Sequence, residues 1–231
     1  MKNKILLITF TLIFSVIFGL EANAYRFDFV TVGDVVRQTQ AAFGELKSYQ
    51  ANFTITSTRG GRRTVQNGIV RYKAPDKLAV EFSNPAGQRI VSDGKTMWIH
   101  IPSLNVVAEQ DLRAGSDNIA TAATPSGLRR LFSRYHYRFA GKEQPEPQKT
   151  GDPLYTLQLR QRETRSGYRS MQLWINKDYM IVKAVGETST GKTVEIALNN
   201  IRTNVDFQNA IFRFDNPQRA RIIKNPMVSE D

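Results

Sequence analysis

The sequence predicts an α+β protein built mainly of antiparallel β-strands, and three observations support this class. Over most of the 231 residues, apolar and polar side chains alternate, which is the pattern of strands with one buried face. Turn signals such as Asp93-Gly94 separate the alternating segments. Two other segments have apolar residues at three- and four-residue spacing, which is typical of amphipathic helices. We therefore expect about eleven strands and two helical segments, in one domain that covers residues 25–231.

The N-terminus has the parts of a secretory signal peptide. A short basic start with Lys2 and Lys4 precedes sixteen mostly apolar residues, and the segment ends in Ala22-Asn23-Ala24. We expect residues 1–24 to be the signal peptide, with cleavage after Ala24 and export to the periplasm. An uncleaved anchor helix is the alternative, but the apolar run falls short of the roughly twenty residues that span a bilayer.

The first helical segment covers Val32 to Leu46, and strands follow it. Thr31 and Asp34 are placed as a capping box at the start of the helix. Arg59-Gly60-Gly61-Arg62 is a turn signal between the first two strands. The strands expected in this half are Tyr49–Thr56, Thr64–Tyr72, Leu78–Phe82, Arg89–Ser92, Thr96–Ile101 and Val106–Glu109.

The alternation stops between Leu112 and Arg134, where we expect a lid. Ser116 to Ala123 has a weak helical pattern that Pro125 interrupts, and a short helix with one apolar stripe follows. This stripe is expected to cover the mouth of a cavity and to touch its ligand. The strands expected beyond it are Arg134–Phe139, Leu154–Arg160, Tyr168–Ile175, Met180–Val185, Thr193–Leu198 and a final pair around Val205 and Phe212.

The charge is strongly basic, with 32 Lys and Arg against 21 Asp and Glu and a net charge of +11. In a cytosolic protein this charge balance would indicate binding to nucleic acid. An exported protein does not encounter nucleic acid, so we expect no nucleic-acid partner. Lipid head groups and acidic faces of membrane proteins are the anionic partners outside the cytoplasm. The alternative is that Lys and Arg only keep strand edges from aggregating.

One motif suggests a nucleotide site, and its context argues against that function. Gly186 to Thr193 (GETSTGKT) matches G-x-x-x-x-G-K-[ST], the phosphate-binding loop. A working loop of this kind opens a long helix, whereas Val194 to Leu198 alternate like a strand. Too few residues follow to supply the further parallel strands. We expect a hairpin turn.

Other catalytic chemistry has little support in the sequence. There are two histidines and no cysteine, which leaves no thiol nucleophile and few metal ligands. No G-x-S-x-G nucleophile elbow is present. We expect no catalytic residue, no metal and no cofactor, although an exported hydrolase is one alternative.

Two stretches, Pro85 to Val107 and Asn199 to Ile222, resemble the LolA family of periplasmic lipoprotein carriers. The first contains the family's run Ser92-Asp93-Gly94-Lys95-Thr96, then Trp98 and a loop with Pro102 and Leu104. The second contains Asn200, Asn204, Val205-Asp206, Phe212-Arg213-Phe214 and Pro217. The resemblance implies an incomplete, half-open β-barrel with a helical lid on its concave side.

The resemblance also implies a function. A protein of this kind accepts lipoproteins from an inner-membrane ABC exporter, holds their acyl chains in a hydrophobic cavity as a monomer, and delivers them to the outer membrane, where a receptor is a possible partner. The absence of cysteine removes the acylated N-terminus of the membrane-anchored receptor branch, so the soluble carrier is the better match. Two alternatives remain, which are a carrier of another envelope lipid or glycolipid, and a periplasmic lipoprotein or lipid sensor of the same fold.

One position departs from the family's pattern. Many of these carriers have an Arg before the proline that corresponds to Pro75, where it ties the lid to the barrel. Here that residue is Ala74, so how the lid is held is an open question. Lys73, one residue earlier, should point to the opposite face of the strand.

A carrier of acyl chains has to hide them from water, which costs about 0.8 kcal/mol for each exposed CH₂. A curved sheet with helices on its concave side provides the necessary cavity. Each candidate lining residue could equally belong to an ordinary core. The candidates are Val35, Val36, Phe43, Leu46, Phe53, Phe82, Met97, Ile99, Leu128, Leu131, Phe132, Leu157, Leu173 and Ile175.

Overall fold

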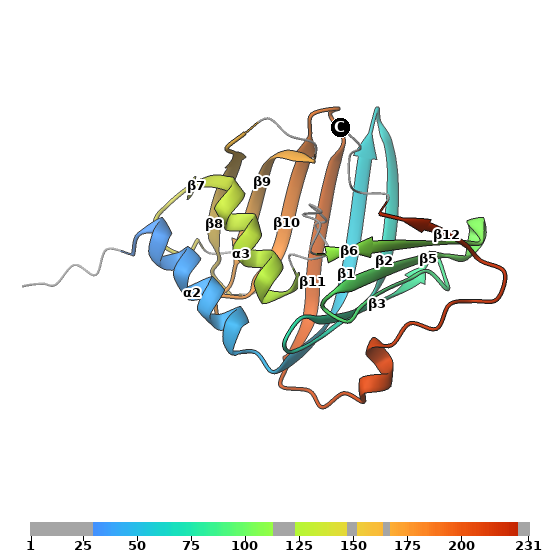
Figure 1. Cartoon of the computed structure of the whole chain (residues 1–231). Coiled ribbons are helices and arrows are strands. Elements are labelled where there is room, and N and C mark those ends of the chain that lie inside the picture. Colours follow the sequence, from blue (N-terminus) through green and yellow to red (C-terminus); the bar gives the residue numbers. More distant parts are fainter. Residues whose placement is uncertain (1–29, 113–122, 147–151, 164–166, 226–231) are drawn as a thin grey trace, which may run out of the picture.

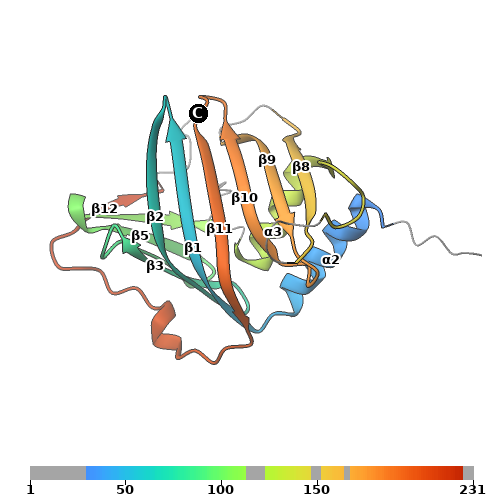
Figure 2. The same cartoon turned by 180° about the vertical axis from the view of Figure 1, so that it is seen from behind.

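One strongly curled β-sheet forms the body of the protein, and two helices lie in its concave side (Figures 1 and 2). The computed structural model describes residues 30–112, 123–146, 152–163 and 167–225. Within these residues the sheet has twelve strands in the order β12-β6-β5-β4-β3-β2-β1-β11-β10-β9-β8-β7. The expected fold class is confirmed, with twelve strands where we expected about eleven. The predicted signal peptide and nearly all of the weak helix at 116–123 lie outside the described residues.

The strands follow the predicted segments closely. The first eleven pair antiparallel with one another, and β12 pairs parallel with β6. The strands are β1 (Ser48–Arg59), β2 (Arg62–Lys73), β3 (Lys77–Asn84), β4 (Arg89–Ser92), β5 (Thr96–Ile101), β6 (Val106–Asp111), β7 (Tyr135–Phe139), β8 (Tyr155–Gln161), β9 (Tyr168–Ile175), β10 (Ile181–Thr188), β11 (Thr193–Thr203) and β12 (Arg221–Lys224).

Strand β1 joins the two halves of the chain. It pairs with β2 on one side and with β11 on the other, so that a hairpin array from the first half meets one from the second half. The two ends of the sheet, β12 and β7, do not pair with each other. The barrel is therefore half open, as Figure 1 shows.

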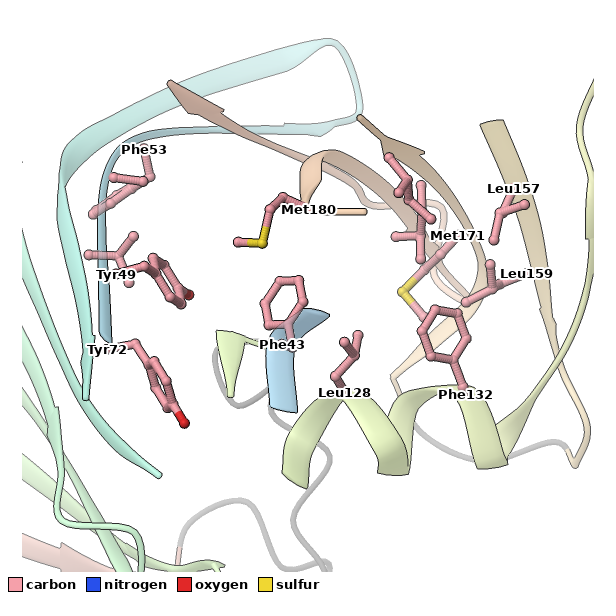
Figure 3. Close-up of a cluster of buried hydrophobic side chains, with 14 of the residues drawn as sticks. Phe43, Tyr49, Phe53, Tyr72, Leu128, Phe132, Leu157, Leu159, Met171 and Met180 are labelled. Carbon is pink, nitrogen blue, oxygen red and sulfur yellow. The ribbon is translucent and has the colours of Figure 1, made fainter. Parts of the chain in front are cut away.

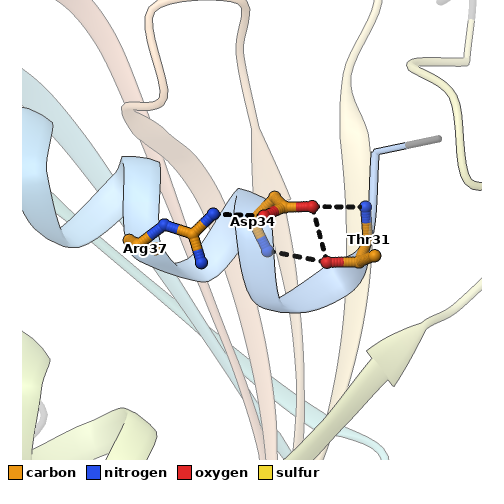
Figure 4. Close-up of polar contacts among 3 residues, drawn as sticks. All are labelled: Thr31, Asp34 and Arg37. Atoms are coloured by element: carbon orange, nitrogen blue, oxygen red, sulfur yellow. Dashed lines mark hydrogen bonds and ion pairs between the residues drawn. The ribbon is translucent and has the colours of Figure 1, made fainter. Parts of the chain in front are cut away.

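Helix α2 (Val32–Glu45) begins with the predicted capping box (Figure 4). The Thr31 hydroxyl oxygen accepts the Asp34 amide at 3.1 Å, and the Asp34 carboxylate accepts the Thr31 amide at 2.9 Å. Arg37 forms an ion pair with the same carboxylate. The hydrogen bonds from Thr31, followed by the one from Arg37, lower the pKa of Asp34 to about 2.

The main core lies between the helices and the sheet (Figure 3). Helix α3 (Pro125–Arg134) starts at Pro125, a position where a missing N–H removes no helix bond. Phe43 of α2 meets Tyr49 edge-on with ring centroids 6.3 Å apart, and Tyr49 stacks on Tyr72 at 5.5 Å. Phe132 of α3 meets Tyr137 edge-on at 5.9 Å. Aromatic contacts from both helices therefore help to bind them to the sheet.

The C-terminal segment corrects one prediction. We expected a final pair of strands around Val205 and Phe212, but residues 209–212 form the 3-10 helix η4 (Asn209–Phe212). Phe207 and Phe212 pack with Ala79 on the face of β3 that points away from the main core, and Phe214 stacks on Trp98 at 5.8 Å. Side-chain packing covers these rings, with Phe207 and Phe212 buried and Phe214 half-buried, so they need no backbone pairing with a neighbouring strand. Their apolar spacing resembled that of a strand for this reason. The last strand is β12 instead.

The motif at residues 186–193 is a hairpin turn, as predicted. Strand β10 ends at Thr188 and β11 begins at Thr193, with Glu187 paired to Thr193. The Thr188 amide donates to the carbonyl of Lys192 at 2.9 Å, and Gly191 has φ of 75°, which favours glycine. No helix follows this loop to present its N-terminus to a phosphate.

Candidate functional site

An unbroken row of apolar side chains crosses the concave face of the sheet. We call it the apolar row. Each of its members is the direct cross-strand partner of the next, so all point to the same face. The first three members belong to the core that the helices cover. The row consists of Ala51, Val70, Val80, Ile90, Ile99, Ala108 and Ile223, on β1, β2, β3, β4, β5, β6 and β12.

Exposure rises along the apolar row toward the free edge of the sheet. Val70 and Val80 are buried, Ile90 and Ile99 are half-buried, and Ile223 is 37% exposed. Six strand spacings of about 4.8 Å make the row roughly 29 Å long. The part of the row on β4, β5, β6 and β12 is thus an extended apolar surface with solvent access, which an apolar ligand would cover at a gain of about 25 cal/mol for each Å².

A small cavity lies beside the apolar row, at the start of α3. Its volume is about 210 Å³, and Leu78, Met97 and Leu112 form its apolar wall. Its other lining residues are polar or charged, or lack a side chain. These are Asp76, Ser92, Gly94, Thr124, Ser126 and Arg130. The cavity lies between the first turn of α3 and the strands β3, β4 and β5.

Hydrogen bonds tie the first turn of α3 to the sheet. The Ser126 hydroxyl donates to the Asp76 carboxylate at 2.9 Å, and the Tyr49 hydroxyl donates to the carbonyl of Ala123 at 2.9 Å. Burial raises the pKa of Tyr49 well above its usual range, which keeps this hydroxyl a donor. Asp76 follows Ala74 by two residues, so it ties the helix to the sheet close to where the family pattern has an Arg.

Lys73 points away from α3 and the main core, as the strand pattern predicted. Its ammonium group donates to the carbonyl of Phe207 at 2.6 Å, on the face of the sheet opposite the main core. The Ser48 hydroxyl donates to the carbonyl of Val205 at 2.5 Å on the same side. Lys73 therefore holds the C-terminal segment and does not replace the missing Arg.

The predicted lining residues separate into three groups. Met97 is buried and lines the small cavity, and Ile99 lies in the apolar row. Leu46 and Leu131 are partly buried against the main core. The other ten are buried members of that core, which are Val35, Val36, Phe43, Phe53, Phe82, Leu128, Phe132, Leu157, Leu173 and Ile175.

Six of the seven members of the apolar row were not among the predicted lining residues, and three of these six, Ala51, Val70 and Val80, lie in the part that the helices cover. Ile90 and Ala108 lie in predicted strands, where each has a charged residue on one side and a valine on the other, so their neighbours do not show which face they occupy. Only the pairing of Ile90 with Ile99, and of Ile99 with Ala108, shows that they share a face. Ile223 lies in a strand that the sequence did not indicate.

The family model described as "Outer membrane lipoprotein carrier protein LolA" matches residues 44–215. The chain belongs to the LolA family. Among its relatives are the outer-membrane lipoprotein carrier proteins of Chromobacterium violaceum, 26% identical, and Bordetella avium, 24% identical. Each alignment covers 81% of this chain and 86% of the relative. The LolA resemblance inferred from the sequence motifs is confirmed.

Solved structures share the fold of this LolA-family chain. An uncharacterized conserved protein from Thermus thermophilus superposes with a TM-score of 0.55 at 14% identity, covering 83% of this chain and 98% of that one. MucB superposes with a TM-score of 0.50 at 16% identity, covering 79% of this chain and 62% of that one. At these identities the likeness concerns the fold alone.

Two further findings follow for this LolA-family member. The carriers of the family are non-enzymatic, which agrees with the prediction that the chain catalyses no reaction. In addition, neither helix of the described residues is long and apolar enough to cross a membrane.

Proposed function

We propose that the protein is a periplasmic chaperone that binds the acyl chains of lipoproteins and carries them from the inner to the outer membrane. The observation that carries this proposal is the apolar row, whose half-buried part reaches solvent. The names of the family and of its relatives support lipoprotein as the cargo. The predicted signal peptide supports the periplasm as the location.

The apolar row shields only one side of a bound acyl chain. Helix α3 therefore acts as the lid that covers the other side. Leu128 and Phe132 of α3 are buried in the main core, in space that further acyl chains would need. Exposing two such side chains costs roughly 3–6 kcal/mol. At about 0.8 kcal/mol per CH₂, burial of four to eight methylenes offsets that cost. A single acyl chain is therefore enough to shift the lid, and its departure lets the lid return.

The same balance explains how loading and release can both occur. An inner-membrane ABC exporter would supply the acyl chains, and a receptor or the outer membrane itself would take them. Because the lid closes over its own apolar residues once the cargo leaves, α3 adds no exposed apolar surface to the half-buried part of the apolar row. The number of acyl chains carried depends on how far α3 moves.

The test compares two matched substitutions from an apolar residue to Asp. Ile99→Asp puts a charge into the middle of the apolar row, where it has no partner when acyl chains cover it. Val65→Asp makes the same change on the opposite face, at a side chain that is 41% exposed. We expect Ile99→Asp to lose binding of a fluorescent acyl probe and Val65→Asp to keep it. Equal binding by both variants would show that the row is not the site.

The identity of the cargo needs a separate measurement. We expect mass spectrometry of the protein isolated from periplasm to find triacylated or diacylated lipoprotein, present with the wild type and absent with Ile99→Asp. Recovery of a glycolipid instead of a lipoprotein would leave the apolar row as the binding site but would change the identity of the cargo.

A further inference from the structure

Exposed apolar side chains gather at one edge of the sheet. In the described residues four large apolar side chains are exposed, and three of them are Leu104 at 67%, Ile222 at 45% and Ile223 at 37%. Leu104 lies in the 3-10 turn η1 (Pro102–Leu104) between β5 and β6, and the two isoleucines lie in β12. Single exposed apolar residues are ordinary, whereas a cluster at one place indicates an interaction surface.

The turn and the strand form one rigid unit. The Arg221 amide donates to the carbonyl of Asn105 at 2.9 Å, and the Asn105 side-chain amide donates to the carbonyl of Arg219 at 3.0 Å. Parallel pairing with β6 holds the rest of β12. Ile222 and Ile223 project to opposite faces of β12, so apolar surface wraps around the free edge of this last strand.

Cations flank the exposed apolar residues. Arg219, Arg221 and Lys224 are all exposed. The ladder places one carboxylate, that of Glu109, opposite Lys224, and this carboxylate accepts the indole N–H of Trp98 at 3.3 Å. The edge therefore combines apolar side chains with a local excess of positive charge. We call the set Leu104, Arg219, Arg221, Ile222, Ile223 and Lys224 the basic edge.

The charges argue against a second copy of the chain as the partner. A free edge strand can pair with the same strand of another molecule. A two-fold antiparallel pair centred on Ile222 and Ile223 would set Arg221 opposite Lys224, and like charges directly opposite are destabilising. An anionic surface attracts Arg221 and Lys224 and can cover the isoleucines without that repulsion.

We propose that the basic edge docks the protein on anionic phospholipid surfaces. Arg and Lys contact the phosphate groups, while Leu104 and the isoleucines enter the boundary between head groups and acyl chains. Ile223 is also the outer end of the apolar row, so docking brings the open end of that row to the membrane. The basic edge lies on the side of the molecule opposite α2 in both views (Figures 1 and 2). Helix α2 therefore stays in water when the basic edge is docked.

The experiment uses the mature chain without cargo and vesicles of phosphatidylcholine with or without phosphatidylglycerol. One variant, Arg219→Gln with Arg221→Gln and Lys224→Gln, removes three charges from the basic edge. The control, Arg138→Gln with Arg160→Gln and Arg169→Gln, removes three charges from an open hollow of about 600 Å³ on the outer face of β7, β8 and β9. A third variant, Leu104→Ser with Ile223→Ser, keeps the charge and removes apolar contact. Thermal melts verify that each variant folds.

We expect the wild type to float with the phosphatidylglycerol vesicles and not with phosphatidylcholine alone. Each cation near an anionic surface strengthens binding by about fivefold. Loss of the three edge charges should therefore weaken binding on the order of 100-fold. The control should weaken it much less, and the serine variant should weaken it at unchanged charge. Equal weakening by both charge variants would assign binding to the overall net charge and overturn the proposal. So would an absence of binding, or a dimer formed through β12.

Failure here leaves the proposed cargo site intact, because acyl-probe binding through Ile99 is measured without vesicles. Conversely, loss of the cargo hypothesis would not change the flotation of the empty protein.

Discussion

The Ser126 hydroxyl donates a hydrogen bond of 2.9 Å to the Asp76 carboxylate, and this bond joins the first turn of α3 to the start of β3. The amide of Ser126 lies 3.4 Å from the same oxygen. Asp76 thus lies where it can hold the lid in a chain that has Ala74 in place of the family's Arg. The bond lies at the wall of the 210 Å³ cavity, so it connects two parts that separate in the proposed function when cargo enters.

The first prediction concerns this bond. Asp76→Ala should lower the free energy of unfolding by about 1 kcal/mol, the usual net worth of one hydrogen bond, and should speed the uptake of an acyl probe. Stopped-flow fluorescence and urea unfolding measure the two effects. Ser126→Ala should give the same result, and the double variant should add little because both remove one interaction. Additive effects would show that the two residues act separately.

The second prediction concerns Phe132, which the structure places in the main core at 3% exposure. Phe132→Ala should lower the free energy of unfolding by about 3–5 kcal/mol, because it removes a buried ring and leaves a cavity. Phe214→Ala is the matched control, since Phe214 is half-buried and stacks on Trp98 outside the main core. We expect a smaller loss there. A Phe132→Ala protein as stable as wild type would mean that α3 is only loosely attached.

The third prediction concerns pH. The pKa of Asp34 is about 2 in the folded protein and 3.8 without its partners, so the folded state favours the ionised carboxylate. The stabilisation is therefore present above pH 4 and lost as the pH falls through 2. Urea unfolding of wild type and Asp34→Asn between these pH values measures it. The difference in stability between the two proteins should shrink as the pH falls, and a constant difference would contradict the assignment.

The fourth prediction concerns the turn at residues 186–193. Lys192→Ala should change the free energy of unfolding by no more than about 0.5 kcal/mol, because substitutions at such turns away from packed contacts usually have small effects. Acyl-probe binding should also be unchanged. Isothermal titration with ATP is the decisive measurement, and micromolar binding that Lys192→Ala abolishes would restore the nucleotide interpretation.

Local features of this protein were determined by the sequence alone. The capping box of Thr31 and Asp34, the hairpin at Asp93-Gly94 and the turn at residues 186–193 each depend on residues within a few positions of one another. Alternation likewise indicates a strand without reference to its partner. For this reason the helices, most of the strands and their buried faces were predicted correctly.

Which strands pair, and in what register, was decided only by the tertiary structure. The contact of β1 with β11 and the apolar row both require residues that are distant in the chain to meet, and no local pattern records that meeting. Ile99 was therefore the one member of the apolar row among the predicted lining residues. The prediction for the C-terminal segment was wrong for the related reason that Phe207, Phe212 and Phe214 satisfy their burial against the outer face of the sheet. The hydrophobic effect is non-directional, so the sequence shows only that these rings must be buried. The assembled sheet decides which surface buries them.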